Sequence, residues 1–275
     1  MELATARSFL FAPGNEERKL RKALAAGADA VIADLEDGVA PERRAEAREV
    51  VGRVLQEVDA ETAVLVRVNP PGSEWSEGDL GLVGGLVLDG VVLPKATPEL
   101  VEALGPDGPP VLAIVESAIG LRDCAATAAA PRVAALALGS HDLGAELRTS
   151  QRADQLELLF ARSQLVLASA AVGLRAPIDT VFLDTRDEKR LEEECRLARS
   201  LGLRGKLCIH PAQLDAVHRV FAPSEEELEW ARRVVEAHER GLEEGRGVVA
   251  LDGRMIDMPI VKQARRLLAE GGRDG

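Results

Sequence analysis

Short apolar runs that alternate with charged segments of helical spacing constrain the fold of this chain more than any other feature. Eight such runs occur, each short enough for one strand. Between them lie segments whose apolar residues recur with the helical period, such as 15–27 and 41–58. This alternation is typical of parallel strands joined by crossover helices. The expected strands are residues 7–13, 29–36, 63–69, 90–95, 110–117, 133–140, 178–184 and 205–211.

Eight strands favour a closed barrel over an open sheet, which commonly uses five or six strands. The length of 275 residues is typical of a single α/β barrel, and no Gly-rich GxGxxG motif follows the first strand. We therefore predict an α/β fold, a (β/α)8 TIM barrel with extra C-terminal helices, as a single domain over residues 1–275. Residues 224–275 form a helical extension that we expect to pack on a neighbouring subunit.

Composition and charge exclude several classes of partner. The net charge of −12 opposes binding to a nucleic acid or to an anionic membrane surface. No apolar run approaches the roughly 20 residues of a membrane-spanning helix, and the first residues lack the apolar core of a signal peptide. The three cysteines have no CxxC spacing, so neither a disulfide framework nor a zinc site is indicated. We expect a soluble cytoplasmic protein.

Ionisable residues follow seven of the eight predicted strands. In barrels of this type the carboxyl ends of the strands surround one mouth, where catalytic groups gather. A strand that leaves a core commonly becomes polar, so one such position alone carries little weight. The candidates are Asp34, Glu36 and Asp37 in "VIADLEDGVAPE", then Arg67, Lys95, Glu116, His141, Asp142, Asp184 and His210.

Arg67 and Glu116 carry more weight because each continues an apolar alternation, in "VLVRVN" and "LAIVES". Their side chains should point into the mouth, where a partly buried charge needs a partner. Carboxylates without a Cys or His cluster favour an oxygen-preferring cation such as Mg²⁺. We predict Glu116 and Asp142 as the metal ligands. The three carboxylates that follow the second strand would then orient the waters of the metal and the arginine.

The planar guanidinium of Arg67 matches a carboxylate, so the predicted substrate is a small organic acid. Beside Mg²⁺, an oxo-acid can chelate the ion through its keto oxygen and one carboxylate oxygen. The metal then stabilises the enolate that forms when the adjacent carbon–carbon bond breaks. This chemistry is that of a lyase or aldolase. Arg67, Glu116 and Lys95 are the residues expected to bind the substrate.

Several segments carry a resemblance to a known family. The chain is similar to the β subunit of citrate lyase and its free-standing relatives, a family that also holds malyl-CoA lyases among the metal-dependent HpcH/HpaI-type aldolases. The similarity extends from about residue 7 to residue 268. The matching segments are the N-terminal stretch "RSFLFAPGNEERKLRKALAAGADAVIADLEDGVAPERRAEAR", then "VRVNPPG", "VVLPKA", "AIVESAIG", "LALGSHDLGAELR", "GKLCIHPAQ" and "DGRMIDMPIVKQA".

The resemblance implies an Mg²⁺-dependent lyase, usually a homotrimer, that cleaves citryl or malyl thioesters to an acetyl thioester and an oxo-acid such as oxaloacetate. It assigns substrate binding to Arg67 and Mg²⁺ binding to Glu116 and Asp142. It also assigns Asp257 as a catalytic acid or base that reaches the site of a neighbouring subunit. Relatives commonly read Gly-Ala-Glu-Asp where this chain has His141 before the metal ligand. His141 is either a new acid or base, given its usual pKa near 6.5, or a solvent-facing residue.

Further alternatives stay open. Lys95 can form a Schiff base with a carbonyl substrate if its amine is desolvated, although we favour its pairing with a carboxylate of the mouth. The chain can instead be a regulatory or structural subunit that binds an oxo-acid. It can also work either alone on a CoA thioester or in a complex with citrate lyase α and acyl-carrier subunits. His210 is expected to be structural, with Pro211 opening the next segment, and the alternative is a substrate contact. No phosphate-binding motif identifies the carrier of the acyl thioester.

Overall fold

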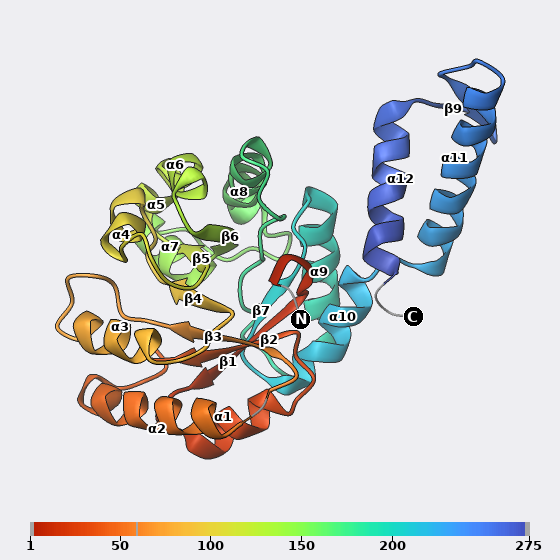
Figure 1. Cartoon of the computed structure of the whole chain (residues 1–275). Helices are drawn as coiled ribbons and strands as arrows, with labels where there is room; N and C mark the ends of the chain where they lie inside the picture. Colours follow the sequence, from red (N-terminus) through yellow and green to blue (C-terminus); the bar gives the residue numbers. More distant parts are fainter. Residues whose placement is uncertain (1–2, 59, 273–275) are drawn as a thin grey trace. The chain divides into compact units, whose positions relative to one another are not determined.

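The computed structural model describes residues 3–58 and 60–272. The chain forms two compact units, which meet in the sequence between Phe221 and Ala222. The first unit contains the sheet and most of the helices, and the second contains two long helices and a hairpin (Figure 1). The helices that we expected beyond the barrel are therefore present, and they form the second unit.

The first unit is built on a parallel sheet of seven strands among the described residues. The strand order is β6-β5-β4-β3-β2-β1-β7, so neighbours in the sequence are neighbours in the sheet except where β7 joins β1. The α/β class is confirmed. The strands are β1 (Ser8–Pro13), β2 (Ala30–Asp34), β3 (Ala63–Arg67), β4 (Gly90–Leu93), β5 (Val111–Val115), β6 (Val133–Leu138) and β7 (Lys206–Cys208).

The prediction of a strand over residues 178–184 is wrong for most of that range. Ile178 pairs with Ala137 of β6 and Asp179 pairs with Lys206 of β7, but these are isolated bridges. Farther along, the Gln213 side chain hydrogen-bonds backbone groups that would otherwise pair between two strands. Its amide nitrogen donates to the Phe182 carbonyl oxygen at 2.7 Å, and its oxygen accepts the Ile209 N–H at 2.8 Å. Because a side chain satisfies these backbone groups, neither this segment nor β7 extends as far as expected.

Helices follow the strands as the sequence pattern predicts. The first helix begins at Glu17, two residues after the start of the expected segment, and its N-cap residue Glu16 makes no side-chain cap hydrogen bond. Gly27 follows the helix with a positive φ of 79°. Short 3₁₀ turns precede several helices. The helices of this unit are α1 (Glu17–Leu24), α2 (Arg44–Glu57), α3 (Ser76–Gly84), α4 (Pro98–Ala103), α5 (Ala118–Arg122), α6 (Cys124–Ala129), α7 (Ser140–Leu147), α8 (Leu159–Ala171), α9 (Glu188–Leu201) and α10 (Leu214–Phe221).

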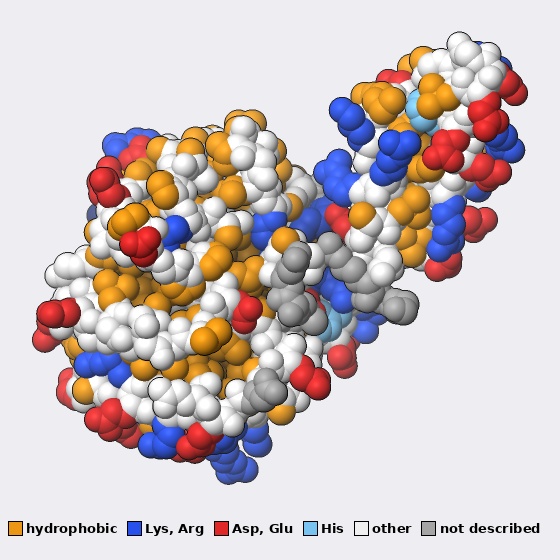
Figure 2. Space-filling model, in the orientation of Figure 1, with side chains coloured by type: hydrophobic (Ala, Val, Ile, Leu, Met, Phe, Trp, Pro, Cys, Tyr) orange, Lys and Arg blue, Asp and Glu red, His pale blue; other side chains and the backbone are white. Residues whose placement is uncertain are grey.

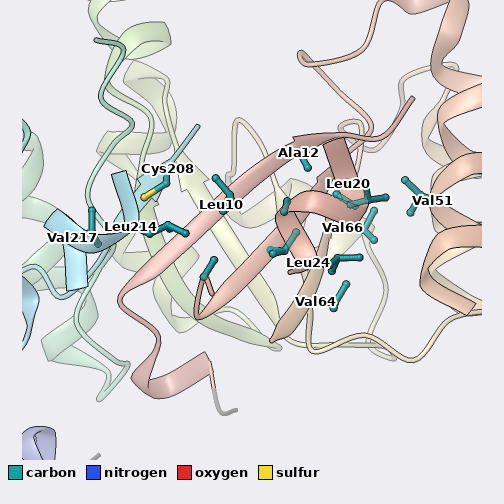
Figure 3. Packing of buried hydrophobic residues seen from close by; sticks show 14 of the residues in the cluster. Leu10, Ala12, Leu20, Leu24, Val51, Val64, Val66, Cys208, Leu214 and Val217 are labelled. Carbon is teal, nitrogen blue, oxygen red and sulfur yellow. The ribbon is translucent and has the colours of Figure 1, made fainter. Parts of the chain in front are cut away.

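Alternate residues of the strands serve two different cores. One set packs against the helices; Figure 3 shows Leu20 and Leu24 of α1 beside Val66 and Val64 of β3 (Figure 3). The other set points inward, and residues from all seven strands meet there in one cluster. Side chains from both ends of the strand order can meet only if the sheet curls on itself. The inner cluster is Ala6, Phe9, Ala30, Ile32, Ala63, Leu65, Val92, Leu112, Ile114, Ala135, Ala137, Ile178 and Leu207.

A buried ionic cluster links the segment around Asp179 to helix α8 and strand β7. The Asp179 carboxylate accepts hydrogen bonds from Arg162 Nε at 2.8 Å, Arg162 Nη2 at 3.0 Å and Lys206 Nζ at 2.8 Å. All three side chains are fully buried. The pKa of Asp179 is lowered because the two cations outweigh the effect of burial, which acts to raise it. The carboxylate is therefore ionised and pairs with both buried cations, and a second carboxylate, Glu194, lies 3.8 Å from the Lys206 amine.

The second unit has its own small core. Helix α11 (Glu225–Glu243) begins at a capping box in which Ser224 accepts the Glu227 N–H. An antiparallel hairpin of β8 (Val249–Leu251) and β9 (Arg254–Ile256) leads to α12 (Met258–Gly271). Charged side chains cover much of the visible surface of these helices (Figure 2). The core consists of Ala231, Val234, Ile256, Val261, Ala264 and Leu267. Within residues 3–58 and 60–272, no helix is both long and apolar enough to cross a membrane.

We predict that Asp179→Ala destabilises the protein by about 3–5 kcal/mol, because it leaves Arg162 and Lys206 buried without their main counterion. Urea unfolding followed by circular dichroism measures the change. Asp154→Ala is the matched control, since Asp154 also binds an arginine with two hydrogen bonds but is exposed. It should leave stability almost unchanged. Equal losses in the two variants would contradict the assignment.

Candidate active site

The period of the strands places three charged side chains on the inner side of the sheet. Asp34, Arg67 and Glu116 stand at or just beyond the ends of β2, β3 and β5. Each follows an inward-facing core residue by two positions, so each continues the inner face. The inward-facing residues are Ile32, Leu65 and Ile114. The orientation that the sequence predicts for Arg67 and Glu116 is thus the one that the strands produce.

Arg67 and Asp34 form an ion pair that the strand register sets. The two residues are direct partners in the β2–β3 pairing. Arg67 Nε donates to Asp34 Oδ1 at 2.7 Å, and Nη2 donates to Oδ2 at 2.6 Å. The guanidinium also lies over the Phe11 ring, 4.8 Å from its centroid. Burial acts to lower the pKa of Arg67, but the hydrogen bonds to Asp34 and the nearby carboxylates outweigh it and raise the pKa.

Arg67 keeps donors for a ligand despite this pair. An arginine has five N–H groups, and two of them bind Asp34. Nη1 lies 3.1 Å from Glu36 Oε2 as an ion pair, but this buried oxygen has no hydrogen-bond partner. Donors therefore remain on both Nη1 and Nη2. A carboxylate matches this pair of donors.

Lys95 connects two carboxylates of the site. Its amine donates to Glu36 Oε1 at 2.7 Å, and its backbone N–H donates to Glu116 Oε1 at 2.8 Å. The expected pairing with a mouth carboxylate is confirmed. Burial acts to lower the pKa of Lys95, but the Glu36 hydrogen bond and the other carboxylates outweigh it and raise the pKa. A raised pKa disfavours the Schiff-base alternative, which needs a neutral amine.

Glu116 is the most perturbed carboxylate of the site. Its residue is only 6% exposed, and burial together with the negative charges of Asp142 and Glu36 raises its pKa to about 7. Gly139 makes room for it: a Cβ at that position would lie 2.4 Å from Glu116 Oε2. The group is thus held in a tight space where a positive charge would lower the free energy of its ionised form.

Asp142 lies in the first turn of α7 and is exposed. Its negative charge is one of the causes of the raised pKa of Glu116. Asp37 is also exposed, and its charge acts on Glu36, Arg67 and Lys95. Five carboxyl groups thus act on one another near two cations, Arg67 and Lys95, so acidic groups outnumber basic ones. These carboxylates are Asp34, Glu36, Asp37, Glu116 and Asp142.

The donor set fits Mg²⁺. Within the described part of the chain, no group of three or more His, Cys, Asp or Glu side chains is arranged to hold a metal by itself. Mg²⁺ is usually held by one or two carboxylates together with waters and substrate oxygens, so Glu116 and Asp142 suffice. Glu36 Oε2 is buried, is ion-paired with Arg67 and has no hydrogen-bond partner, so it could accept a hydrogen bond from a water on such an ion.

The family model described as HpcH/HpaI aldolase/citrate lyase matches residues 7–104 and 106–211. The chain belongs to this family. It is 37% identical to a (3S)-malyl-CoA thioesterase of Cereibacter sphaeroides, over 96% of this chain and 94% of that protein. The expectations of a lyase family and of magnesium as its metal are confirmed by these matches together with two solved relatives.

Both solved relatives are from Mycobacterium tuberculosis. The protein CitE in complex with magnesium, acetoacetate and coenzyme A has a TM-score of 0.86 and 37% identity, over 98% of this chain and 100% of that chain. The citrate lyase beta subunit complexed with oxaloacetate and magnesium has a TM-score of 0.73 and 36% identity, over 81% of this chain and 100% of that chain.

The other candidates of this family member lie in different places. His210 caps the following turn, accepting the Ala212 N–H, which confirms its structural role. His141 and Asp184 are exposed and line a pocket of about 480 Å³ with Ser140 and Thr180. Asp257 belongs to the second unit, where it is the N-cap of α12.

Sequence reasoning missed the residues that shape the site. Phe11, beneath Arg67, has the same strand parity as the inward Phe9, and this signal was available. Gly38 gives the Asp34 carboxylate its space, since a Cβ there would lie 2.3 Å from Oδ2. Thr180 binds the start of α7 through its hydroxyl. No local pattern distinguishes that threonine from others in the sequence.

We predict that Glu116 makes the metal-free protein less stable as the pH rises. Its folded-state pKa of about 7 lies above the usual 4.5, so the folded state holds the proton more tightly between these values. The stability contribution is present below about pH 4.5 and is lost as the pH passes 7, a change of about 3 kcal/mol. Urea unfolding in EDTA at several pH values measures it. The control is Glu116→Gln, which stays neutral at every pH. The free energy of unfolding of the wild type should fall with pH relative to that of this variant, and parallel pH profiles of the two proteins would refute the prediction.

Proposed function

We propose that the chain is an Mg²⁺-dependent carbon–carbon lyase that cleaves a citryl- or malyl-type thioester to an acetyl thioester and an oxo-acid such as oxaloacetate. The observation that carries the proposal is the buried Glu116, whose pKa is raised by burial and by Asp142 and Glu36, and which Lys95 connects to the carboxylate that pairs with Arg67. A cation relieves this repulsion, and the remaining Arg67 donors match an organic acid. The relatives in complex with magnesium, oxaloacetate or coenzyme A support this choice.

The residues of the site take distinct roles in this proposal. Glu116 and Asp142 would hold the ion, and Glu36 would accept a hydrogen bond from one of its waters. When bound, magnesium supplies the positive charge that stabilises an enolate. Arg67 holds the substrate carboxylate through Nη1 and Nη2, while Asp34 fixes the guanidinium plane. Lys95 keeps Glu36 and Glu116 in position and adds positive charge beside the substrate.

Asp257 is proposed as the catalytic acid or base, supplied to the site of a neighbouring subunit in a homotrimer. Support comes from the exposed apolar side chains near it in the sequence, since exposed apolar patches mark interaction surfaces. Met255, Met258 and Val248 are 63%, 45% and 52% exposed. Helix α8 and the turn before it also present Leu156, Phe160 and Leu167, which are 56%, 69% and 65% exposed. These surfaces suit an assembly.

Three finer points complete the proposal. We propose that the sheet forms a (β/α)8 barrel, with residues 178–179 in the place of one strand, because they hydrogen-bond to β6 and β7. Three buried, free cysteines support the reducing cytoplasm as the compartment. The acyl group is carried by coenzyme A or by an acyl-carrier partner, as expected for a relative of a citrate lyase subunit.

We predict that citryl, malyl or methylmalyl thioesters are cleaved with Mg²⁺ and not in EDTA, and that Glu116→Ala abolishes Mg²⁺ binding in a folded protein. Product analysis follows the reaction, and calorimetry measures Mg²⁺ affinity. The matched control is Glu102→Ala, since Glu102 is an exposed carboxylate on α4.

Release of free malate instead of an oxo-acid would favour hydrolysis, the activity that the thioesterase relative is named for. Normal Mg²⁺ affinity in Glu116→Ala would remove this residue from the site.

We predict that two inactive variants restore each other's activity when co-expressed. Glu116→Gln lacks a metal ligand and Asp257→Asn lacks the acid or base, but a mixed trimer pairs an intact mouth with an intact Asp257 from the next subunit. Random mixing should make about one quarter of the sites complete. Rates are compared with each variant alone and with wild type, and light scattering reports the mass. No recovery in mixed trimers would place Asp257 outside the neighbour's site.

A further inference from the structure

The start of helix α7 is capped by a residue 40 positions away. Gly139, at the N-cap, has no side chain to accept the first N–H groups. Thr180 Oγ1 accepts the Ser140 N–H at 3.1 Å and is 2.8 Å from Ser140 Oγ. Gly139 is required there because any Cβ would meet Glu116. The glycine that makes room for one carboxylate therefore leaves a helix end that Thr180 completes.

Thr180 is itself held by the buried ionic cluster. It is 2% exposed and directly follows Asp179, which binds Arg162 and Lys206. The Asp179 N–H donates to the Gly205 carbonyl oxygen at 2.9 Å. The residue before Thr180 is thus held both by its side chain, through the two cations, and by its backbone N–H. Such a group can hold a helix end in one place with little movement.

The other end of the same helix is tied to the chain beside Glu116. Glu146 Oε2 accepts the Ala118 N–H at 2.9 Å, two residues after Glu116. Asp142 lies between these two attachments, two residues after Ser140. Both predicted metal ligands are consequently linked to α7: Asp142 belongs to it, and Glu116 lies against its N-cap glycine.

We propose that Thr180 is a positioning residue for the magnesium site, which fixes the start of α7 so that Asp142 faces the ion together with Glu116. This inference rests on the proposed function, because it takes Asp142 as a metal ligand. Thr180 does not touch the substrate or the ion in this role. Its contribution is to Mg²⁺ affinity, since residues that orient metal ligands commonly change that affinity about 10-fold to 100-fold.

Thr180→Val tests the proposal because it keeps the shape of the side chain and removes the hydroxyl. Calorimetry with MgCl₂ alone should show Mg²⁺ binding weakened about 10-fold or more. Thr180→Ser, which restores the hydroxyl, should return the affinity to near the wild-type value. The matched control is Thr127→Val, another buried threonine, whose hydroxyl donates to the Asp123 carbonyl oxygen at 3.4 Å. This control should leave Mg²⁺ affinity unchanged.

Two further variants separate the possible failures. Ser140→Ala removes the hydroxyl–hydroxyl contact with Thr180 and keeps the backbone one. We expect it to weaken Mg²⁺ binding about 2-fold to 10-fold. This variant decides the question if Thr180→Val does not fold. Asp142→Asn tests the metal ligand itself. If Asp142→Asn loses Mg²⁺ but Thr180→Val and Ser140→Ala bind it normally, the positioning role is overturned and the proposed function stands. If Asp142→Asn binds Mg²⁺ normally, the proposed ligand set is overturned as well.

Discussion

Repulsion among the carboxylates at the ends of the parallel strands is the constraint on which the site depends. The strand period directs Asp34 and Glu116 inward, and the β2–β3 register sets Arg67 opposite Asp34. Two cations do not neutralise five carboxylates, and burial makes the excess charge more costly for Glu36 and Glu116. In the proposed function, a divalent ion held here would relieve this repulsion and would supply the charge that an enolate needs. The proposal thus explains metal binding and catalysis by the same arrangement.

The site also depends on groups that carry no charge. Gly38 and Gly139 leave space for Asp34 and Glu116, where any larger residue would collide with a carboxylate oxygen. Lys95 adopts a left-handed backbone conformation, with a φ of 52°, and in that position its N–H reaches Glu116. A non-glycine residue in this region carries strain, which is commonly found at functional sites. The geometry of the carboxylates therefore comes from backbone and packing as much as from charge.

Much of this arrangement follows from local patterns. The period-2 alternation in "VLVRVN" and "LAIVES" was sufficient to place Arg67 and Glu116, because a strand with one face in the core fixes the direction of its next residues. The segment after residue 177 was predicted wrongly because its apolar run looks like a strand, while a distant side chain, Gln213, takes its backbone partners. Thr180 was missed for the same reason: its partner, the Ser140 N–H, is remote in the sequence. Hydrogen bonds between residues that are remote in the sequence produce no periodic pattern by which they could be predicted.

The partial occupation of Arg67 has a consequence for selectivity. With Asp34 bound at Nε and Nη2, the guanidinium offers a ligand only its outer end, through Nη1 and Nη2. One carboxylate fills that end completely. A dicarboxylic acid must then direct its second acid group elsewhere, and a longer or shorter spacer between the two groups would misplace one of them. In the proposed site, selectivity for the length of the ligand would therefore come from the distance between Arg67 and the group that binds the second acid.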